Sequence, residues 1–317
     1  MGRGELTGGA GLGRKGSDAL SFLNQGGVYV AMVTPLEQSG RIDEAGVSRL
    51  VEHVLTGEVD GIVALGSSGE GVALPRAERR RLLRLVVSEV GGRVPVVAGV
   101  AQMTAELARR DLAEAAEEGA AAGLVVPPFY FELSQGAVRR FFEDLSDARI
   151  LPILLYNIPR FTKIRLEPET VAGLALRDNI VGIKDSSRDM EYLQQVARLT
   201  ADRPAFSVFT GSDSLLLCSL LAGAHGIIGV CPNVVPRLCV ELYRTFRQGR
   251  WDEARRLQAR VTDALLAVRR GDFPAGFKAA LELLGICDRW LAHPGQPLNE
   301  GELRALGEAM RHAQILE

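Results

Sequence analysis

Short apolar runs alternate with longer amphipathic stretches along the chain from about residue 27 to residue 232. Eight such runs occur, at residues 28–33, 61–65, 94–98, 123–126, 151–155, 180–183, 206–209 and 226–230. Continuous apolar character is typical of strands that are buried on both faces, as in a parallel sheet. Between the runs, apolar residues recur at helical spacing, for example at Leu82, Leu83, Val86 and Val87.

This order of segments predicts an α/β fold, a (β/α)₈ barrel, rather than an open doubly wound sheet. We expect the barrel over residues 26–232. Residues 233–317 contain no strand-like run and predict helices, at roughly 234–248, 251–269, 275–285 and 300–313, that pack on the barrel or on a second subunit. Residues 1–25 are Gly-rich and polar, and we expect a flexible N-terminal extension there.

Charge and hydropathy exclude several classes of protein. The formal net charge is −2 and the pI is about 6.2, so no basic excess indicates nucleic-acid binding. No stretch approaches the ~20 consecutive apolar residues of a membrane span, and the N-terminus lacks an apolar signal core. We expect a cytoplasmic protein that binds neither membrane nor nucleic acid, with the basic cluster 79–84 on a solvated helix face.

The cysteines do not indicate a disulfide framework or a redox motif. No C-x-x-C pair occurs, and each cysteine lies in or beside an apolar segment. We expect small buried hydrophobic residues in a reducing cytoplasm. The four positions are Cys218, Cys231, Cys239 and Cys287.

One lysine has an unusual position. Of the 37 basic residues only four are lysines, and Lys184 alone ends an unbroken apolar run. Arginine stays protonated, whereas a partly buried lysine can lose its proton and become a nucleophile. A strand-end lysine is therefore suited to forming an imine with a ketone. The alternative is a solvated lysine that emerges from the end of its strand.

Other strand ends carry polar or aromatic residues, and in such barrels the active site lies at the C-terminal ends of the strands. Ser67 and Ser68 lie in a glycine-bounded turn that can hold a carboxylate, or form an ordinary loop. Tyr156 can relay protons beside a lysine amine, or be a structural tyrosine. The aromatic cluster 129–131 can line a pocket or pack between subunits. Hydroxyls, a tyrosine and a lone lysine thus share one rim.

Four motifs together give the chain a resemblance to a known family. They are GSSGE at 66–70, YNIP at 156–159, GIKD at 182–185 and GSD at 211–213. The chain resembles the dihydrodipicolinate synthase / N-acetylneuraminate lyase family of class I, Schiff-base-forming pyruvate aldolases, from about Gly27 to at least Lys278. The resemblance implies a (β/α)₈ barrel with a C-terminal helical extension, in a homo-oligomer that is a dimer or a tetramer.

The resemblance implies catalytic roles for four residues. Lys184 matches the lysine that forms a Schiff base with pyruvate or another 2-oxo acid. Tyr156 matches the tyrosine that moves protons near the imine. Ser68 matches a hydroxyl of the proton relay, and Tyr130 matches a tyrosine that reaches into the neighbouring subunit's site.

The resemblance also implies a substrate site without a metal or a cofactor. Ser67 and Ser68 match the hydroxyls around the 2-oxo acid carboxylate. Gly211 belongs to the fourth motif, GSD at 211–213, and Ile228 matches a residue whose backbone carbonyl faces the substrate. The few histidines show no ligand spacing, which argues against a metal-dependent aldolase.

Three departures from the family pattern concern the second substrate. Phe161 occupies the position at which the synthases carry the arginine that binds the aldehyde partner's carboxylate. Lys163 replaces a usual glycine, and the second glycine of Gly99-Val100-Ala101 is missing. These departures favour a Schiff-base lyase or aldolase that acts on pyruvate or a related 2-oxo acid, with 2-keto-3-deoxy sugar acids among the candidates. The alternatives are 4-hydroxy-tetrahydrodipicolinate synthase and a non-catalytic 2-oxo acid-binding barrel.

Overall fold

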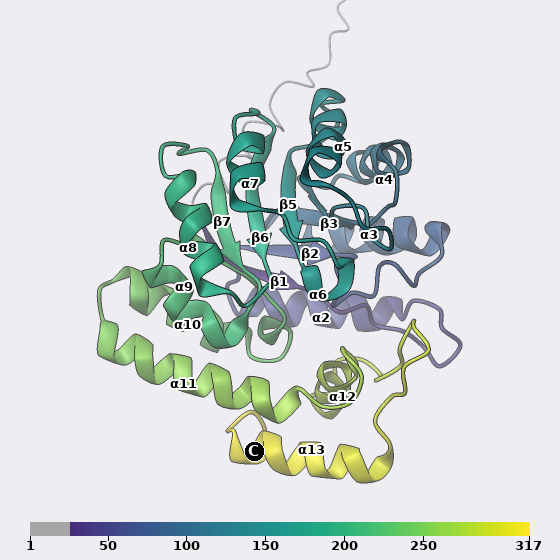
Figure 1. Ribbon diagram of the computed structural model, residues 1–317. Coiled ribbons are helices and arrows are strands. Elements are labelled where there is room, and N and C mark those ends of the chain that lie inside the picture. Colours follow the sequence, from purple (N-terminus) through teal and green to yellow (C-terminus); the bar gives the residue numbers. More distant parts are fainter. Residues whose placement is uncertain (1–25) are drawn as a thin grey trace, which may run out of the picture.

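Eight parallel strands close into a barrel in the computed structural model, which describes residues 26–317 (Figure 1). Each strand pairs with the next in sequence, and β8 closes the barrel on β1, with Gly27 opposite Gly226. The predicted (β/α)₈ fold is confirmed, while the expected N-terminal extension lies outside the described residues. The strands are β1 Gly27–Ala31, β2 Gly61–Ala64, β3 Val96–Val100, β4 Ala122–Val125, β5 Ile153–Asn157, β6 Ile180–Asp185, β7 Ser207–Thr210 and β8 Gly226–Gly229.

Helices follow the strands and surround the barrel, as Figure 1 shows. Asp43 caps the helix Glu44–Thr56 by accepting a hydrogen bond from the Gly46 N–H, and Thr104 caps the helix Ala105–Glu117 by accepting one from the Leu107 N–H. The helices of the barrel are α2 Glu44–Thr56, α3 Arg76–Val90, α4 Ala105–Glu117, α5 Gln135–Asp147, α6 Pro159–Thr162, α7 Pro168–Leu174, α8 Met190–Leu199 and α9 Leu216–Leu221. Two short 3₁₀ turns, η1 Asp213–Leu215 and η2 Cys231–Asn233, flank β8.

Four helices follow the barrel, at the positions that the apolar spacing predicted. They are α10 Pro236–Arg247, α11 Trp251–Val268, α12 Ala275–Leu283 and α13 Glu300–His312. In Figure 1, α11, α12 and α13 lie together along one side of the barrel. The division of the chain into a barrel domain and a helical extension stays a prediction. No described helix is long and apolar enough to cross a membrane.

β5 and β6 extend beyond the ends of the apolar runs that predicted them, and the added residues belong to the site. Tyr156 and Lys184, expected at or just past the ends of their strands, lie inside β5 and β6 and are register partners. The ladder continues because backbone pairing does not require an apolar side chain. Their side chains are 4% and 5% exposed, so both are held by the barrel wall rather than by a loop.

The interior and exterior of the barrel wall have separate apolar cores. Inside, Tyr29 and Phe209 meet edge to face with ring centroids 5.4 Å apart. Outside, apolar side chains of the strands pack against the helices. Tyr156 belongs to the interior core, so one face of its ring is packed within the barrel.

One expectation from the sequence is wrong in detail. Cys218 is exposed, because it lies on the outer face of the short helix α9, whereas the other three cysteines are buried. The basic cluster on α3 lies on an exposed helix face, as expected, and its arginines also pair with acidic side chains. Arg84 donates two hydrogen bonds to Glu118, at 2.7 and 2.8 Å, and Arg80 also binds that carboxylate. The acidic residues at the end of α4 therefore neutralise this helix face.

Candidate active site

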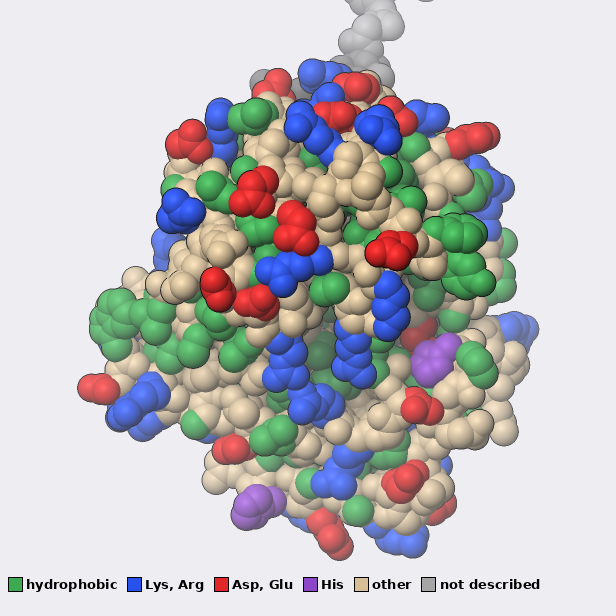
Figure 2. Space-filling view, in the orientation of Figure 1, with side chains coloured by type: hydrophobic (Ala, Val, Ile, Leu, Met, Phe, Trp, Pro, Cys, Tyr) green, Lys and Arg blue, Asp and Glu red, His purple; other side chains and the backbone are tan. Residues whose placement is uncertain are grey.

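A cavity of about 160 Å³ opens at the C-terminal ends of the strands. Strand-end residues form one wall, and residues 265–277 of the C-terminal region form the other. Figure 2 shows a hollow at this place, between the barrel and the C-terminal helices. The cavity brings together the predicted site residues Ser67, Ser68, Tyr156, Lys184, Gly211 and Ile228.

Tyr130 is the predicted site residue that the cavity does not include. Its side chain is 84% exposed and stacks edge to face on Phe131, with ring centroids 5.0 Å apart. Its φ of +78° places a non-glycine residue in the left-handed region. The ring therefore points to the outside of this chain.

Lys184 and Tyr156 form the centre of the cavity. The Nζ atom of Lys184 lies 4.5 Å from the centroid of the Tyr156 ring. Within residues 26–317, no carboxylate lies within ion-pair distance of this Nζ. A buried amine next to a phenol, and open to a cavity, has the arrangement that imine formation requires.

The neighbouring residues fix the two strands relative to each other. Because side chains alternate along a strand, Asn157 and Asp185 point away from the cavity. The Asn157 amide donates to the Asp185 carboxylate at 2.7 Å, and the hydroxyl of Ser187 donates to the same carboxylate at 2.9 Å. Burial raises the pKa of Asp185, and these hydrogen bonds act against the shift. The contact holds the register that places Tyr156 beside Lys184.

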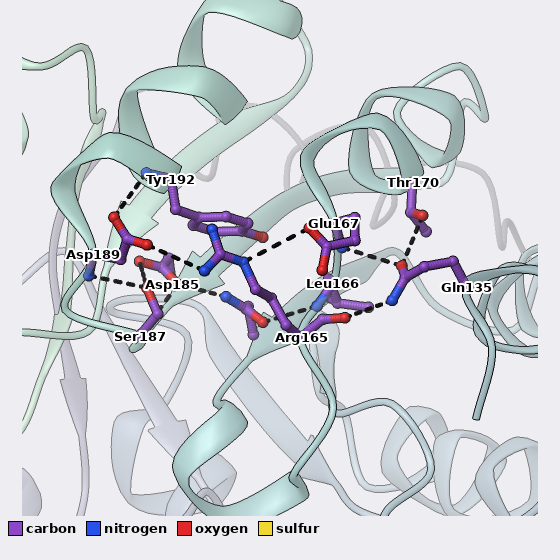
Figure 3. Close-up of polar contacts among 10 residues, drawn as sticks. Gln135, Arg165, Leu166, Glu167, Thr170, Asp185, Ser187, Asp189 and Tyr192 are labelled. Carbon is purple, nitrogen blue, oxygen red and sulfur yellow. Dashed lines mark hydrogen bonds and ion pairs between the residues drawn. The ribbon is translucent and has the colours of Figure 1, made fainter. Parts of the chain in front are cut away.

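A polar network extends from Asp185 along the outside of the barrel (Figure 3). Ser187 accepts a hydrogen bond from the Asp189 N–H, and Asp189 forms an ion pair with Arg165 at 3.1 Å. The Arg165 guanidinium also lies over the Tyr192 ring, 4.7 Å from its centroid. This network anchors the loop that follows the lysine strand.

The serine loop after β2 is held in a constrained conformation. Leu65 and Glu70, on either side of the two serines, have φ values of +62° and +54°. Left-handed conformations of such residues persist only where the surroundings enforce them. Here the Thr34 hydroxyl donates to the Gly69 carbonyl at 2.6 Å. Glu70 forms a buried ion pair with Lys278 of α12 at 2.6 Å. The loop is thus tied both to the barrel and to the C-terminal helices.

Gly211 and Asp213 complete the opposite side of the cavity. A Cβ atom at Gly211 would lie 2.0 Å from the Ser186 Oγ and 2.9 Å from the Lys184 Cε, so no side chain fits beside the lysine. The Asp213 carboxylate accepts hydrogen bonds from the N–H groups of Cys231 and Val230, at 3.0 and 3.3 Å. Burial raises the pKa of Asp213, while these N–H groups and the Lys184 charge act against the shift.

A second, larger cavity of about 390 Å³ adjoins the first. The two share Ser67, Tyr156, Ile158, Phe161 and Phe273 in their walls. Phe161, at the position of the family's arginine, is 48% exposed and lines both. Lys163, in place of the usual glycine, has a φ of +62° and ends the short helix α6. Of the departures seen in the sequence, Phe161 therefore lies at the wall between the two cavities, and Ala101 lines the larger cavity alone.

No group of three or more His, Cys, Asp or Glu side chains within residues 26–317 could hold a metal ion. The cavity instead presents an amine, hydroxyls and a phenol. These groups fit a carbonyl compound with a carboxylate, since hydroxyls donate to carboxylates.

Several residues that support the site could not be given a role from the sequence alone. Lys278 was visible as a rare lysine, and Asn157, Asp185 and Asp213 lay within the quoted motifs, but their partners come from other strands or helices. Arg160, Arg188 and Arg269 also line the cavity. Only the closed barrel and the helix α11 bring these three arginines together.

Comparisons with known proteins agree with this geometry. The sequence profile of the Dihydrodipicolinate synthetase family matches residues 24–313. A protein of Citrifermentans bemidjiense named 4-hydroxy-tetrahydrodipicolinate synthase is 34% identical over 290 residues, which cover 92% of this chain and 99% of that protein. A protein of Hyphomonas neptunium with the same name is 36% identical over 82% of this chain and 89% of its own length.

Solved structures with this fold include several of the same kind. A monomeric dihydrodipicolinate synthase variant has a TM-score of 0.89 at 29% identity, covering 93% of this chain and 99% of its own. The dihydrodipicolinate synthase of Thermotoga maritima has a TM-score of 0.88 at 30% identity, covering 92% and 99%. A prophage protein of the dihydrodipicolinic acid synthase family from E. coli K12, solved in complex with pyruvate, has a TM-score of 0.87 at 29% identity, covering 92% and 99%.

Proposed function

The chain belongs to the dihydrodipicolinate synthetase family of class I lyases, and we propose that it acts through a Schiff base between Lys184 and pyruvate or a related 2-oxo acid. The observation that carries this proposal is the position of the Lys184 amine. It is buried, lies 4.5 Å from the centroid of the Tyr156 ring, and opens onto a cavity that the serine loop also lines.

The proposed reaction begins with attack of the neutral Lys184 amine on the ketone carbon of the 2-oxo acid. The tetrahedral adduct loses water, with Tyr156 as proton donor through its hydroxyl and Ser68 as part of the proton relay. Ser67 and Ser68 bind the carboxylate, and the backbone at Ile228 faces the bound acid. Gly211 leaves the space in which the imine forms.

The protonated imine withdraws electrons from the adjacent carbon, which then loses a proton to give an enamine. In the condensation direction the enamine carbon attacks an aldehyde and forms a carbon–carbon bond. In the cleavage direction the same bond breaks and the electron pair returns to the imine. Water finally releases the product and regenerates the lysine.

The curated relatives make 4-hydroxy-tetrahydrodipicolinate synthase the second candidate, since they carry that name at about one-third identity. That reaction joins pyruvate to aspartate semialdehyde. At the position of the synthases' arginine this chain has Phe161, which cannot bind a carboxylate. We expect slow turnover of aspartate semialdehyde, and a steady-state assay against a family synthase measures it directly. Turnover equal to the synthase would favour the second candidate.

Trapping with pyruvate and borohydride tests the proposal. The proposal predicts one reduced pyruvyl group per chain in the intact mass, and none when borohydride or pyruvate is omitted. A barrel that binds 2-oxo acids without chemistry would bind pyruvate and gain no covalent mass, which would refute the proposed reaction.

We further propose that the protein acts in the cytoplasm as a homo-oligomer, a dimer or a tetramer. The exposed Tyr130 and Phe131 support this assembly, because 84% and 64% of these large side chains are in contact with solvent in the single chain. In the oligomer Tyr130 would reach a neighbouring site. A dihydrodipicolinate synthase variant of this fold is monomeric, so light scattering must decide the assembly.

A further inference from the structure

Three arginines surround the mouth of the cavity that holds Lys184. Arg160 follows β5, Arg188 follows β6, and Arg269 follows α11, and all three side chains are exposed. Figure 2 shows basic side chains around this hollow. Positive groups gathered at the mouth of one small cavity attract anions, because a cleft focuses the field of its charges.

None of the three arginines has a carboxylate partner within residues 26–317. The Arg160 guanidinium lies 5.6 Å from the ring centroid of Phe161, and Arg188 donates to the Ser214 hydroxyl at 3.4 Å. The single carboxylate of the cavity wall, Asp213, is fully buried and accepts hydrogen bonds from backbone N–H groups. The cavity mouth therefore keeps an uncompensated positive charge. By contrast, the arginines of α3 are paired with acids of α4.

The backbone at Arg188 supports a role for this side chain. Its φ is +65°, a left-handed conformation that glycine adopts without strain and other residues adopt at a cost. Arg188 follows Lys184 by four positions in the loop that the Asp185 network anchors. The anchored loop therefore holds Arg188 at the mouth of the cavity that contains Lys184.

The remaining polar lining of this side of the cavity consists of hydroxyls. Ser186, Ser212 and Ser214 all line the wall from which Arg188 extends. Serine hydroxyls both donate and accept hydrogen bonds, so they suit the hydroxyl groups of a sugar chain. The guanidinium fork suits a terminal carboxylate or phosphate.

We propose that the second reactant is a hydroxylated aldehyde that carries a terminal anion, bound by Arg188 and Arg269 with Arg160 nearby. This inference rests on the proposed Schiff-base reaction and names the substrate class of the same site. In the cleavage direction the substrate is the corresponding 4-hydroxy-2-oxo acid, whose far end is a carboxylate or a phosphate. Arg188 follows β6 and Arg269 follows α11, whereas Phe161 lies in α6. Arg188 and Arg269 therefore serve an anion placed differently from that of aspartate semialdehyde.

Calorimetric titration tests the anion site directly. The titrants are glycerol 3-phosphate, glycerate and glycerol, which share a three-carbon hydroxylated skeleton and differ in their terminal group. The protein is titrated both unmodified and after trapping with pyruvate and borohydride, because the trapped group fills the 2-oxo acid subsite. We expect at least one anion to bind about tenfold or more tightly than glycerol, and the two anions to separate phosphate from carboxylate recognition.

Arg188→Gly is the decisive variant, because glycine tolerates the backbone conformation that arginine adopts there. We expect anion affinity to fall about tenfold to hundredfold, the loss expected for a charge-assisted hydrogen bond. The matched control is Arg149→Gly, since Arg149 is exposed, has a φ of +47°, and lies before β5 at the opposite end of the barrel. That variant removes the same charge in the same backbone region and should bind the anions normally.

The outcomes separate the two proposals. Anion binding that is lost in Arg188→Gly and kept in Arg149→Gly supports the anion site. Equal binding of glycerol and both anions, or unchanged anion affinity in Arg188→Gly, overturns it. Failure of the proposed reaction would appear separately, as an absent pyruvyl adduct, and the titration of unmodified protein would still report on the arginines.

Discussion

Two lysines are buried near the C-terminal end of the barrel, and they differ in what surrounds the nitrogen. Lys278 is fully buried, and its ammonium pairs with Glu70 at 2.6 Å and donates to the Trp290 carbonyl. Lys184 is 5% exposed and has an aromatic ring and a cavity beside it, with no carboxylate in ion-pair contact among the described residues. Both are lysines in a chain whose basic residues are mostly arginine.

The difference separates a structural lysine from a reactive one. Burial lowers the pKa of Lys278, and Glu70 acts against that shift by favouring the charged form. A buried ion pair of this kind holds two segments together, and loss of one partner leaves the other charge uncompensated. Lys184 has no such partner to hold it, and its amine faces space that a small molecule can enter. Pairing and access, rather than burial alone, therefore distinguish the two lysines.

Among the variants that separate the two lysines, Lys184→Arg should have the largest effect on activity. A guanidinium does not attack a carbonyl at neutral pH, so pyruvate adduct formation and lyase activity should both be abolished. The fold should remain intact, as circular dichroism would show. A variant that still gained the reduced pyruvyl mass would move the Schiff base to another lysine.

Tyr156→Phe should weaken the reaction without removing the nucleophile. Loss of an acid–base group slows turnover by about 10²–10⁴-fold. The ring that packs beside Lys184 is retained, so stability should change little. Stopped-flow measurement of adduct formation, together with steady-state kcat, would check this. A loss under about tenfold would remove the phenol from proton transfer.

Lys278→Met should have the opposite effect to the two site variants. It should lose much stability, while the Lys184 nucleophile is still present. Leaving Glu70 buried without its partner is expected to cost about 3–5 kcal/mol in the free energy of unfolding. Urea denaturation measures it. The double variant Glu70→Gln/Lys278→Met should recover much of the loss, because no uncompensated charge remains.

Lys184→Met is the matched control for that experiment. Since Lys184 forms no ion pair with a carboxylate of residues 26–317, its removal should change stability by only about 1 kcal/mol or less. Equal losses of stability in the two methionine variants would contradict the distinction between a paired structural lysine and an unpaired reactive one.

The ion pairs between α3 and α4 should contribute the smallest of these effects on stability. The hydrogen bonds from Arg84, together with Arg80, lower the pKa of Glu118 to about 2. A lowered carboxyl pKa stabilises the fold above the ordinary pKa, and the stabilisation is lost as the pH falls from about 4.5 through about 2. After allowance for solvent screening this contribution is about 1 kcal/mol.

In Glu118→Gln the free energy of unfolding should therefore fall less on acidification, by about 1 kcal/mol. Urea denaturation at pH 3 and pH 6 would show a smaller difference for the variant than for the parent protein. An unchanged pH dependence would mean that these pairs contribute nothing at the helix surface.

The barrel could be predicted from the sequence because each buried parallel strand is a continuous apolar run. Its site could be placed because Ser67, Tyr156 and Lys184 follow or end such runs, and strand ends of a barrel meet at one rim. The C-terminal ends of the strands were harder to predict. Backbone pairing continues through Tyr156 and Lys184, where apolar character stops.

Other features could not be predicted because they depend on contacts between distant segments. Glu70 lies after β2 and Lys278 in α12, so nothing local in the sequence pairs them. The left-handed conformation of Arg188 is likewise invisible in a sequence. Tyr130 points away from this chain, and its predicted role in a neighbouring site stays a prediction.

The most direct test is to find which lysine carries the pyruvyl group after borohydride reduction. Peptide mapping by mass spectrometry distinguishes the Lys184 peptide from those of Lys278 and Lys163. We expect label on Lys184 alone, at one group per chain. Label on Lys278 or Lys163, or no label at saturating pyruvate, would contradict it.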